Sequence, residues 1–280
     1  MKKWIGTLAL GSLAALGATA CDDSGTEPNA LDMATVRAEA ALVAEDGMFQ
    51  DLSLAQDPGL QGVGFPGMGA SPALAAGMGG GDGMCQSLGV GAAYQCPNLV
   101  RDGFTFTREV TFFDASDEAQ PGGFDAATTD AIHMLVNAEG SRERTFWSAT
   151  IERSRDMWLT ELLSDAHHLN GEGHEMVARS GNPQAGGEQT FDMTVDVSWD
   201  DVVHLQPREE HPYPESGSIT RDIFVEVTRD GEVVGSRDVT TVITFNGTQF
   251  VIMNVGGEEV EVDLAKREVT RRWGGNGGHG

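Results

Sequence analysis

Two histidines and a glutamate near the middle of the chain are the residues best placed to hold a metal ion. In the segment HHLNGEGHE, His167 precedes the dipeptide Asn170-Gly171, and His174 and Glu175 follow it. If this dipeptide forms a two-residue turn, His167 lies opposite His174 on one side of a sheet. Two imidazoles with a nearby carboxylate suit Zn²⁺ or Cu²⁺. A four-residue loop would place His167 opposite Met176 instead, and surface histidines at the tip of a hairpin are the simpler interpretation.

A row of aspartates offers a second set of candidate catalytic groups. Asp192, Asp196, Asp200 and Asp201 form this row on the polar face of an alternating segment. Paired carboxylates do acid–base chemistry when burial separates their pKa values, but a solvated strand face also explains these four. The chain has no G-x-S-x-G motif, and no second histidine follows His174 at the spacing of a zinc protease. The sequence therefore favours a non-catalytic protein, with an envelope hydrolase or a metal-dependent enzyme as the alternative.

No cofactor is expected. The segment GVGFPG at 62–67 has the letters of a dinucleotide-binding loop, but no strand precedes it, and Pro66 stands where the helix should begin. Met68, Met78 and Met84 could offer soft ligands to Cu(I), although isolated methionines in a glycine-rich segment are usually filler.

The N-terminus predicts export. The segment MKKWIGTLALGSLAALGATAC has two lysines, then an apolar run too short to span a membrane comfortably, then small residues before Cys21. This window resembles the lipobox of bacterial lipoproteins, which implies that 1–20 is a signal peptide and that Cys21 becomes the lipidated N-terminus. The resemblance implies a membrane anchor and a place in the cell envelope, facing the periplasm or the cell surface. Ordinary signal peptidase cleavage after 18–20, with a free Cys21, is the other interpretation.

The two other cysteines are expected to pair with each other. Cys85 and Cys96 lie close in sequence, and an exported chain meets an oxidising compartment. A disulfide closing such a short loop contributes about 2–3 kcal/mol in the chain-entropy model. Their pairing leaves Cys21 as the odd thiol.

The charge of the chain limits its partners. Asp and Glu number 43 against 18 Lys and Arg, which gives a formal net charge of −25. Such a surface repels nucleic acid, so nucleic acid is excluded as a partner of the folded part.

The organisation of the chain follows from changes in composition. A flexible tether is expected at 21–29, a helical segment at 30–56, a glycine-rich connector with the disulfide at 57–100, an antiparallel β domain at 101–272 and a flexible tail at 273–280. In the helical segment, Asn29 can cap the start and Gly47 can stop the helix. Met33, Val36 and Val43 recur at helical spacing, so this helix is expected to dock on the main domain.

The β domain shows alternating residues and turn dipeptides. In FDMTVDVSW, residues 191–199, apolar residues occupy every second position, which indicates strands with one buried and one wet face. The dipeptides Asp230-Gly231, Asn246-Gly247 and Gly256-Gly257 separate such runs. We expect a three-residue loop with a bulge at Gly231, which matches Val227 with Val233.

For Asn246-Gly247 we expect a two-residue loop that sets Ile243 opposite Phe250. The fold class predicted is mainly β, a hairpin-linked antiparallel meander forming a barrel, half-barrel or sandwich.

These observations favour a membrane-anchored envelope lipoprotein that acts as a non-catalytic binding or envelope-interaction module. Its partners would be the membrane, through the lipid, and an apolar ligand or an envelope protein. An empty apolar pocket in the β domain would support an apolar ligand, whereas a filled core would argue against one. A purely structural surface lipoprotein is the second interpretation.

Overall fold

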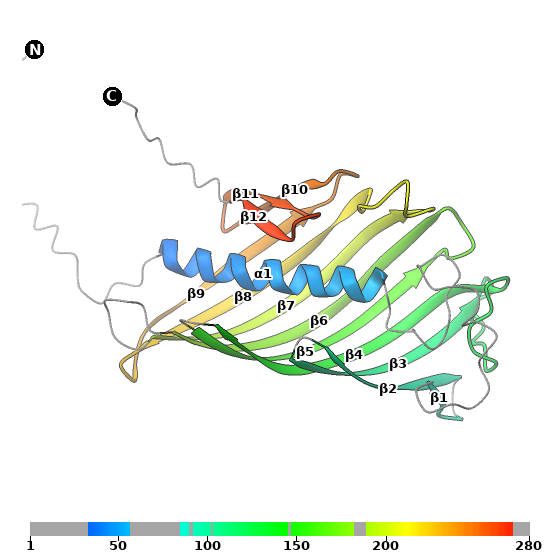
Figure 1. Ribbon diagram of the computed structural model, residues 1–280, viewed down its shortest axis with the longest axis horizontal. Helices are drawn as coiled ribbons and strands as arrows, with labels where there is room; N and C mark the ends of the chain where they lie inside the picture. The colour runs from blue at the N-terminus through cyan, green and yellow to red at the C-terminus, as the bar shows by residue number, and fades with distance from the viewer. Residues whose placement is uncertain are drawn as a thin grey trace, which may run out of the picture. The chain divides into compact units, whose positions relative to one another are not determined.

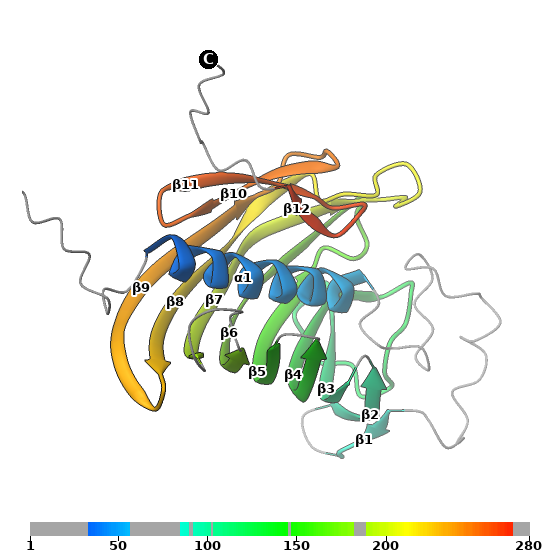
Figure 2. The same cartoon turned by 60° about the vertical axis from the view of Figure 1, so that its left-hand side comes forward.

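A curved sheet wrapped around one helix makes up the described part of the chain. The computed structural model describes residues 33–56, 85–89, 92–101, 103–144, 147–181 and 189–270. Within these ranges twelve strands follow one another in sequence order in one antiparallel sheet, and the helix lies along its concave face (Figures 1 and 2). The segments expected to be a signal peptide (1–20), a tether with Cys21 and a tail (273–280), and most of the expected connector, lie outside the described residues.

The elements are the helix α1 Met33–Gln56 and the strands β1 Gln86–Ser87, β2 Ala93–Arg101, β3 Phe104–Asp114, β4 Thr129–Arg144, β5 Trp147–Thr160, β6 Ala166–Gly181, β7 Gln189–Leu205, β8 Ser216–Arg229, β9 Glu232–Thr244, β10 Phe250–Val255, β11 Glu258–Asp263 and β12 Glu268–Thr270. No helix among the described residues has both the length and the apolar character needed to cross a bilayer.

The predicted fold class is confirmed, and the sheet is open rather than closed into a barrel. Its edges are β1 and β12, so of the three architectures the half-barrel describes it best. Buried and exposed side chains alternate along the strands, so the sheet has one apolar and one polar face. On β7 the side chains of Phe191, Met193, Val195 and Val197 are buried on the concave side, and Asp192 on the convex side is exposed. Each strand therefore contributes every second residue to the core.

Helix α1 fills the concave face. Its buried side chains include Val36, Val43, Met48 and Leu52, and it packs against β8, β9 and β10. Docking of this helix on the sheet is confirmed. Gly47, however, does not end the helix, which runs nine residues further to Gln56. The space in which an apolar ligand was expected is thus occupied by the chain itself.

The predicted disulfide is present and ties the first strands to the sheet. The Sγ atoms of Cys85 and Cys96 are 2.01 Å apart, and the Cys96 side chain is buried in the core. β1 and β2 lie within the stretch expected to be a connector. Pairing with β3 supplies backbone hydrogen bonds that the local composition did not indicate.

Two of the three C-terminal hairpins differ in register from the prediction. Asp230-Gly231 forms a two-residue turn with φ of 50° and 84°. The bulge lies further along, where Val227 pairs with Gly235 and Thr228 with Val233, so a bulge at Gly231 is wrong. The third dipeptide, Gly256-Gly257, forms the expected two-residue turn.

The Asn246 loop is longer than expected, because Ile243 pairs with Met253 rather than with Phe250. The loop is held from outside the hairpin. The amide of Phe245 donates to the carbonyl of Gly217, and the amide of Gly247 donates to the carbonyl of Pro214. A tertiary contact therefore overrides the local turn preference.

Candidate functional site

Arginines among the described side chains point into the concave face of the sheet. They include Arg108 on β3, Arg142 on β4, Arg153 and Arg155 on β5, Arg179 on β6 and Arg221 on β8. Arg221, for example, alternates with the buried Ile219 and Ile223. A buried guanidinium is costly unless carboxylates pair with it, so the partners of these arginines determine what the face can do.

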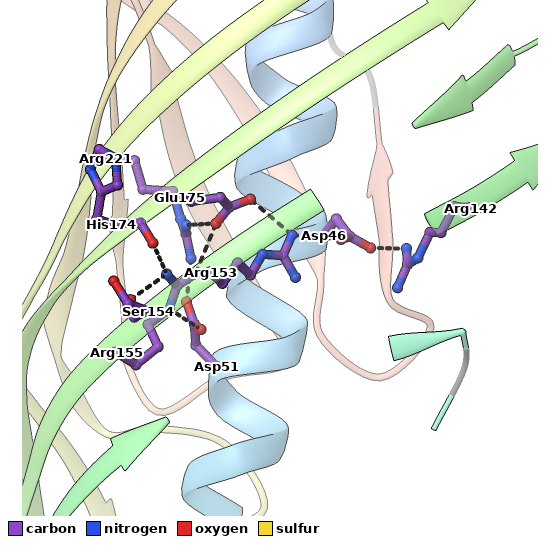
Figure 3. A network of polar contacts seen from close by, with 9 residues as sticks. All are labelled: Asp46, Asp51, Arg142, Arg153, Ser154, Arg155, His174, Glu175 and Arg221. Atoms are coloured by element: carbon purple, nitrogen blue, oxygen red, sulfur yellow. Dashed lines mark hydrogen bonds and ion pairs between the residues drawn. The ribbon is translucent and has the colours of Figure 1, made fainter. Parts of the chain in front are cut away.

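Glu175 on β6 stands at the centre of the buried arginines (Figure 3). Its Oε1 lies 2.9 Å from Nη2 of Arg153, and its Oε2 lies 2.8 Å from Nη2 of Arg155 and 3.4 Å from Nη1 of Arg221. Its side chain is 0% exposed. Burial alone would raise the pKa of Glu175, but the three guanidinium groups hold that pKa at about 2.

Helix α1 supplies the remaining negative charge. Asp51 accepts a 2.9 Å hydrogen bond from Nε of Arg155 and also pairs with Arg221. Asp46 accepts a 2.9 Å hydrogen bond from Nη2 of Arg153. The three buried arginines of β5 and β8 are thus balanced by Glu175, Asp46 and Asp51. Two further pairs, Glu39 with Arg179 and Asp46 with Arg142, join α1 to β6 and β4.

Two glycines make room for the arginines. A Cβ on Gly47 would lie 2.6–2.7 Å from the guanidinium atoms of Arg221, and a Cβ on Gly173 would lie 2.8 Å from Cδ of Arg155. Gly47 therefore lets the helix approach the sheet closely, which explains a glycine in the middle of a helix that it does not end.

The concave network is suited to holding the helix and not to acid–base catalysis. A general acid or base works best with a pKa near the operating pH, whereas the pKa of Glu175 is about 2. Asp51 is likewise committed to two arginines. No observation in the described residues favours the hydrolase alternative.

The structure separates the residues predicted to bind a metal. β6 runs unbroken through Asn170-Gly171, so the turn expected there is wrong. His167 pairs with His204 across β6 and β7, and His174 lies on the convex face. Glu175 points to the opposite face from His174, as neighbouring residues of a strand must. The described residues contain no group of three or more His, Cys, Asp or Glu side chains placed to hold a metal ion.

The convex face carries two adjoining grooves. One, of about 710 Å³, crosses β4–β8 and is lined by the carboxylates of Asp156, Glu172, Asp196 and Asp222. The other, of about 360 Å³, extends to β2 and includes Glu139 and Glu152. Both contain Asn137, Ser154 and His174, so they form one depression, which we call the convex groove. Arg153 and Arg155 belong to its lining, but their side chains make their ion pairs on the concave side.

Imidazoles and an aromatic ring accompany the acids of the convex face. Nδ1 of His174 lies 2.9 Å from Oδ1 of Asp196, and Nε2 of His133 lies 2.7 Å from Oδ1 of Asp156. The ring of His133 stacks on that of Trp158, with centroids 4.4 Å apart. Trp158 is 37% exposed, so its ring offers a flat apolar surface next to the groove.

The convex groove has the dimensions of an extended peptide. Strands lie about 4.8 Å apart, so the part of the groove from β3 to β8 spans about 24 Å, which equals about seven extended residues. Its ionisable lining consists of six carboxylates and His174, because the side chains of Arg153 and Arg155 are turned to the concave side. Asp192, Asp200 and Asp201 are exposed on the same sheet and extend the acidic surface. A basic segment would match it.

Comparison of the chain with protein-family models, with curated proteins and with solved structures found no match.

The sequence contains a signal for the buried network. Arg153 and Arg155 on β5, Glu175 on β6 and Arg221 on β8 occupy the phase of their strands that is otherwise apolar. A charged residue in the buried phase of an alternating strand indicates an internal ion pair. The acids of α1 gave no such sign, because Glu39, Asp46 and Asp51 lie in a helix without a clean polar face.

Proposed function

We propose that the protein is a lipid-anchored, non-catalytic interaction module of the cell envelope that binds a basic segment of a partner protein in the convex groove. The observation that carries the proposal is the contrast between a concave face filled by α1 and a convex groove lined by six carboxylates. Opposite charge would steer the partner to this face and set its register, with weaker binding at higher salt.

The anchor is tested by cell fractionation. Cys21 would carry the lipid, as the resemblance of 1–21 to a lipobox implies. We expect Cys21→Ser to move the protein from the membrane fraction to the soluble fraction, and Ser24→Ala, a control three residues away, to leave it in the membrane. A Cys21→Ser protein that stays in the membrane fraction would contradict the lipid anchor.

The groove is tested with a labelled peptide of seven residues that alternates lysine with alanine. We expect fluorescence anisotropy to show saturable binding to the full chain. Asp156→Asn with Asp196→Asn should weaken this binding about tenfold.

The matched control carries Glu259→Gln with Glu261→Gln, which removes the same charge from β11, outside the groove. It should change the affinity less than twofold. An equal loss in both double variants would mean that binding follows net charge alone, and it would refute the groove as the site.

A further inference from the structure

A second cluster of polar groups lies at one end of β6 and β7, apart from the arginine network. His167 on β6 and His204 on β7 are direct partners in the sheet register, and both are buried. Arg208 follows four residues after His204, in the connection to β8. Along β6, His167 and Glu175 are eight residues apart, or about 26 Å. The cluster is therefore distinct from the network around Glu175.

Polar side-chain atoms of His204 and Arg208 lack partners among the described residues. His204 is 0% exposed, and neither of its ring nitrogens has a hydrogen-bond partner in the described part of the chain. Nε and Nη2 of Arg208 are buried and without partners in the same residues. Nδ1 of His167 lies 3.2 Å from Nε2 of Gln206. The His167 ring also hydrogen-bonds the backbone of Leu162 and Ser164, so its polar atoms are already engaged and it flanks His204.

No carboxylate balances the cluster. Among the described residues, neither His204 nor Arg208 forms an ion pair with Asp or Glu, although the chain has 43 acidic residues. His168 next to it belongs to the convex face, where it contacts Asp201 and Glu161. Burial, Arg208 and His167 lower the pKa of His204 to about 3, and burial lowers the pKa of Arg208 to about 10. Buried N–H donors with no acceptor call for an anionic one.

We propose that His204 and Arg208, flanked by His167, form a binding site for a small oxyanion, the phosphate or carboxylate group of a ligand. The guanidinium fork of Arg208 matches the paired oxygens of such a group, and the imidazole N–H of His204 adds a donor. A metal cation at the two histidines is disfavoured by the positive charge of Arg208. This replaces the metal interpretation of His167.

The connection that carries Arg208 is the side from which an oxyanion would enter. Arg208 is only partly buried, whereas His204 is completely buried. The ends of the connection are fixed to the sheet, since the amide of Gln206 donates to the carbonyl of Asp165 and the amide of Glu215 donates to the carbonyl of Val203.

The site is tested by NMR of the full chain with ¹⁵N-labelled histidine at pH 6.5, titrated with inorganic phosphate and, separately, with acetate. We expect the ring signals of His204, and of its sheet partner His167, to move saturably with at least one anion, because a bound oxyanion accepts the N–H group of His204 and adds negative charge beside both rings. The signals of His174 should not follow the same curve. A tighter response to phosphate assigns a phosphoryl ligand, and a tighter response to acetate assigns a carboxylate.

Arg208→Gln should weaken binding of the anion that shifts these signals about tenfold or more. Arg208→Lys, which keeps the charge but loses the guanidinium fork, should weaken the binding less. The control is Arg237→Gln, because Arg237 is an exposed arginine of β9 whose Nη1 donates to the carbonyl of Ser236, outside the cluster. It should leave the affinity unchanged. If neither anion moves the two histidines, or if both Arg208 variants bind as tightly as the natural protein, the site does not exist. Neither result bears on the convex groove, which these residues do not line.

Discussion

The two faces of the sheet use charged residues in opposite ways. On the concave face, Arg155 and Glu175 are buried and pair with each other. Next to them in the same strands, Asp156 and His174 reach the convex face, where they line an open groove. The comparison shows that the phase of a residue in its strand, rather than its type, decides whether its charge holds the fold together or is available to a partner.

The largest effect is expected at the centre of the concave face. Glu175→Gln would leave Arg153, Arg155 and Arg221 with too few carboxylates, so we expect the free energy of unfolding to fall by about 3–5 kcal/mol. Chemical denaturation measures this change. The convex counterpart, Glu172→Gln, removes an exposed carboxylate of the same strand and should change stability by less than about 0.5 kcal/mol. Similar losses in both variants would contradict the division between the faces.

Acid should destabilise the concave side in two steps. The pKa of folded His204, about 3, lies below its ordinary value of 6.5, so the unfolded chain takes up this proton first and stability falls as the pH drops below about 6.5. The pKa of Glu175 is about 2 in the folded chain against an ordinary 4.5, so its contribution to stability is lost only as the pH falls below about 4.5.

Between pH 6 and pH 4.5 His204 should therefore lower the free energy of unfolding of the natural protein by about 2 kcal/mol, and we expect His204→Gln to lack this loss. Above pH 7.5 the free energies of unfolding of the natural protein and the variant should change with pH in the same way. Denaturation curves that keep the same pH dependence in the variant would show that His204 does not remain neutral in the folded state.

The close approach of helix and sheet gives the next effect. Gly47→Ala improves helix propensity by about 1 kcal/mol, but the new methyl would overlap the guanidinium of Arg221, so we expect a net loss of about 1–3 kcal/mol. Gly122→Ala is the control, because a Cβ there meets nothing within 4 Å. If thermal unfolding shows Gly47→Ala to be stabilised, the helix does not need its close contact.

The smallest effect on stability is expected on the convex face. Asp196→Asn breaks only an exposed contact with His174, so the free energy of unfolding should change by less than about 0.5 kcal/mol. The same substitution contributes to the loss of peptide binding expected of the double variant with Asp156→Asn. A large loss of stability would mean that the convex acids hold the fold together.

The sequence predicted the sheet well because period-two alternation reports directly on burial. Phe191 to Trp199 and the disulfide between Cys85 and Cys96 follow from local patterns. The pairing of Ile243 with Met253 does not, since a contact from Gly217 and Pro214 sets that register.

The sites were harder to predict than the sheet. The sequence suggested His167 as a candidate metal ligand opposite His174, but its partner in the sheet is His204, which lies 37 positions away and meets it through strand pairing. The convex groove depends on curvature and on which strands are adjacent. Neither property is encoded in a single segment, so composition and spacing could not reveal them.

Hydrogen exchange of α1 tests most directly whether the concave face is permanently filled. We expect the buried amides of α1 to exchange only through global unfolding, with the same free energy as those of β6–β8, in the presence and absence of the lysine peptide. If instead α1 exchanges at a much lower free energy than these strands, the helix leaves the sheet in the native state. The concave face would then be open to a ligand, which would contradict a binding role confined to the convex groove.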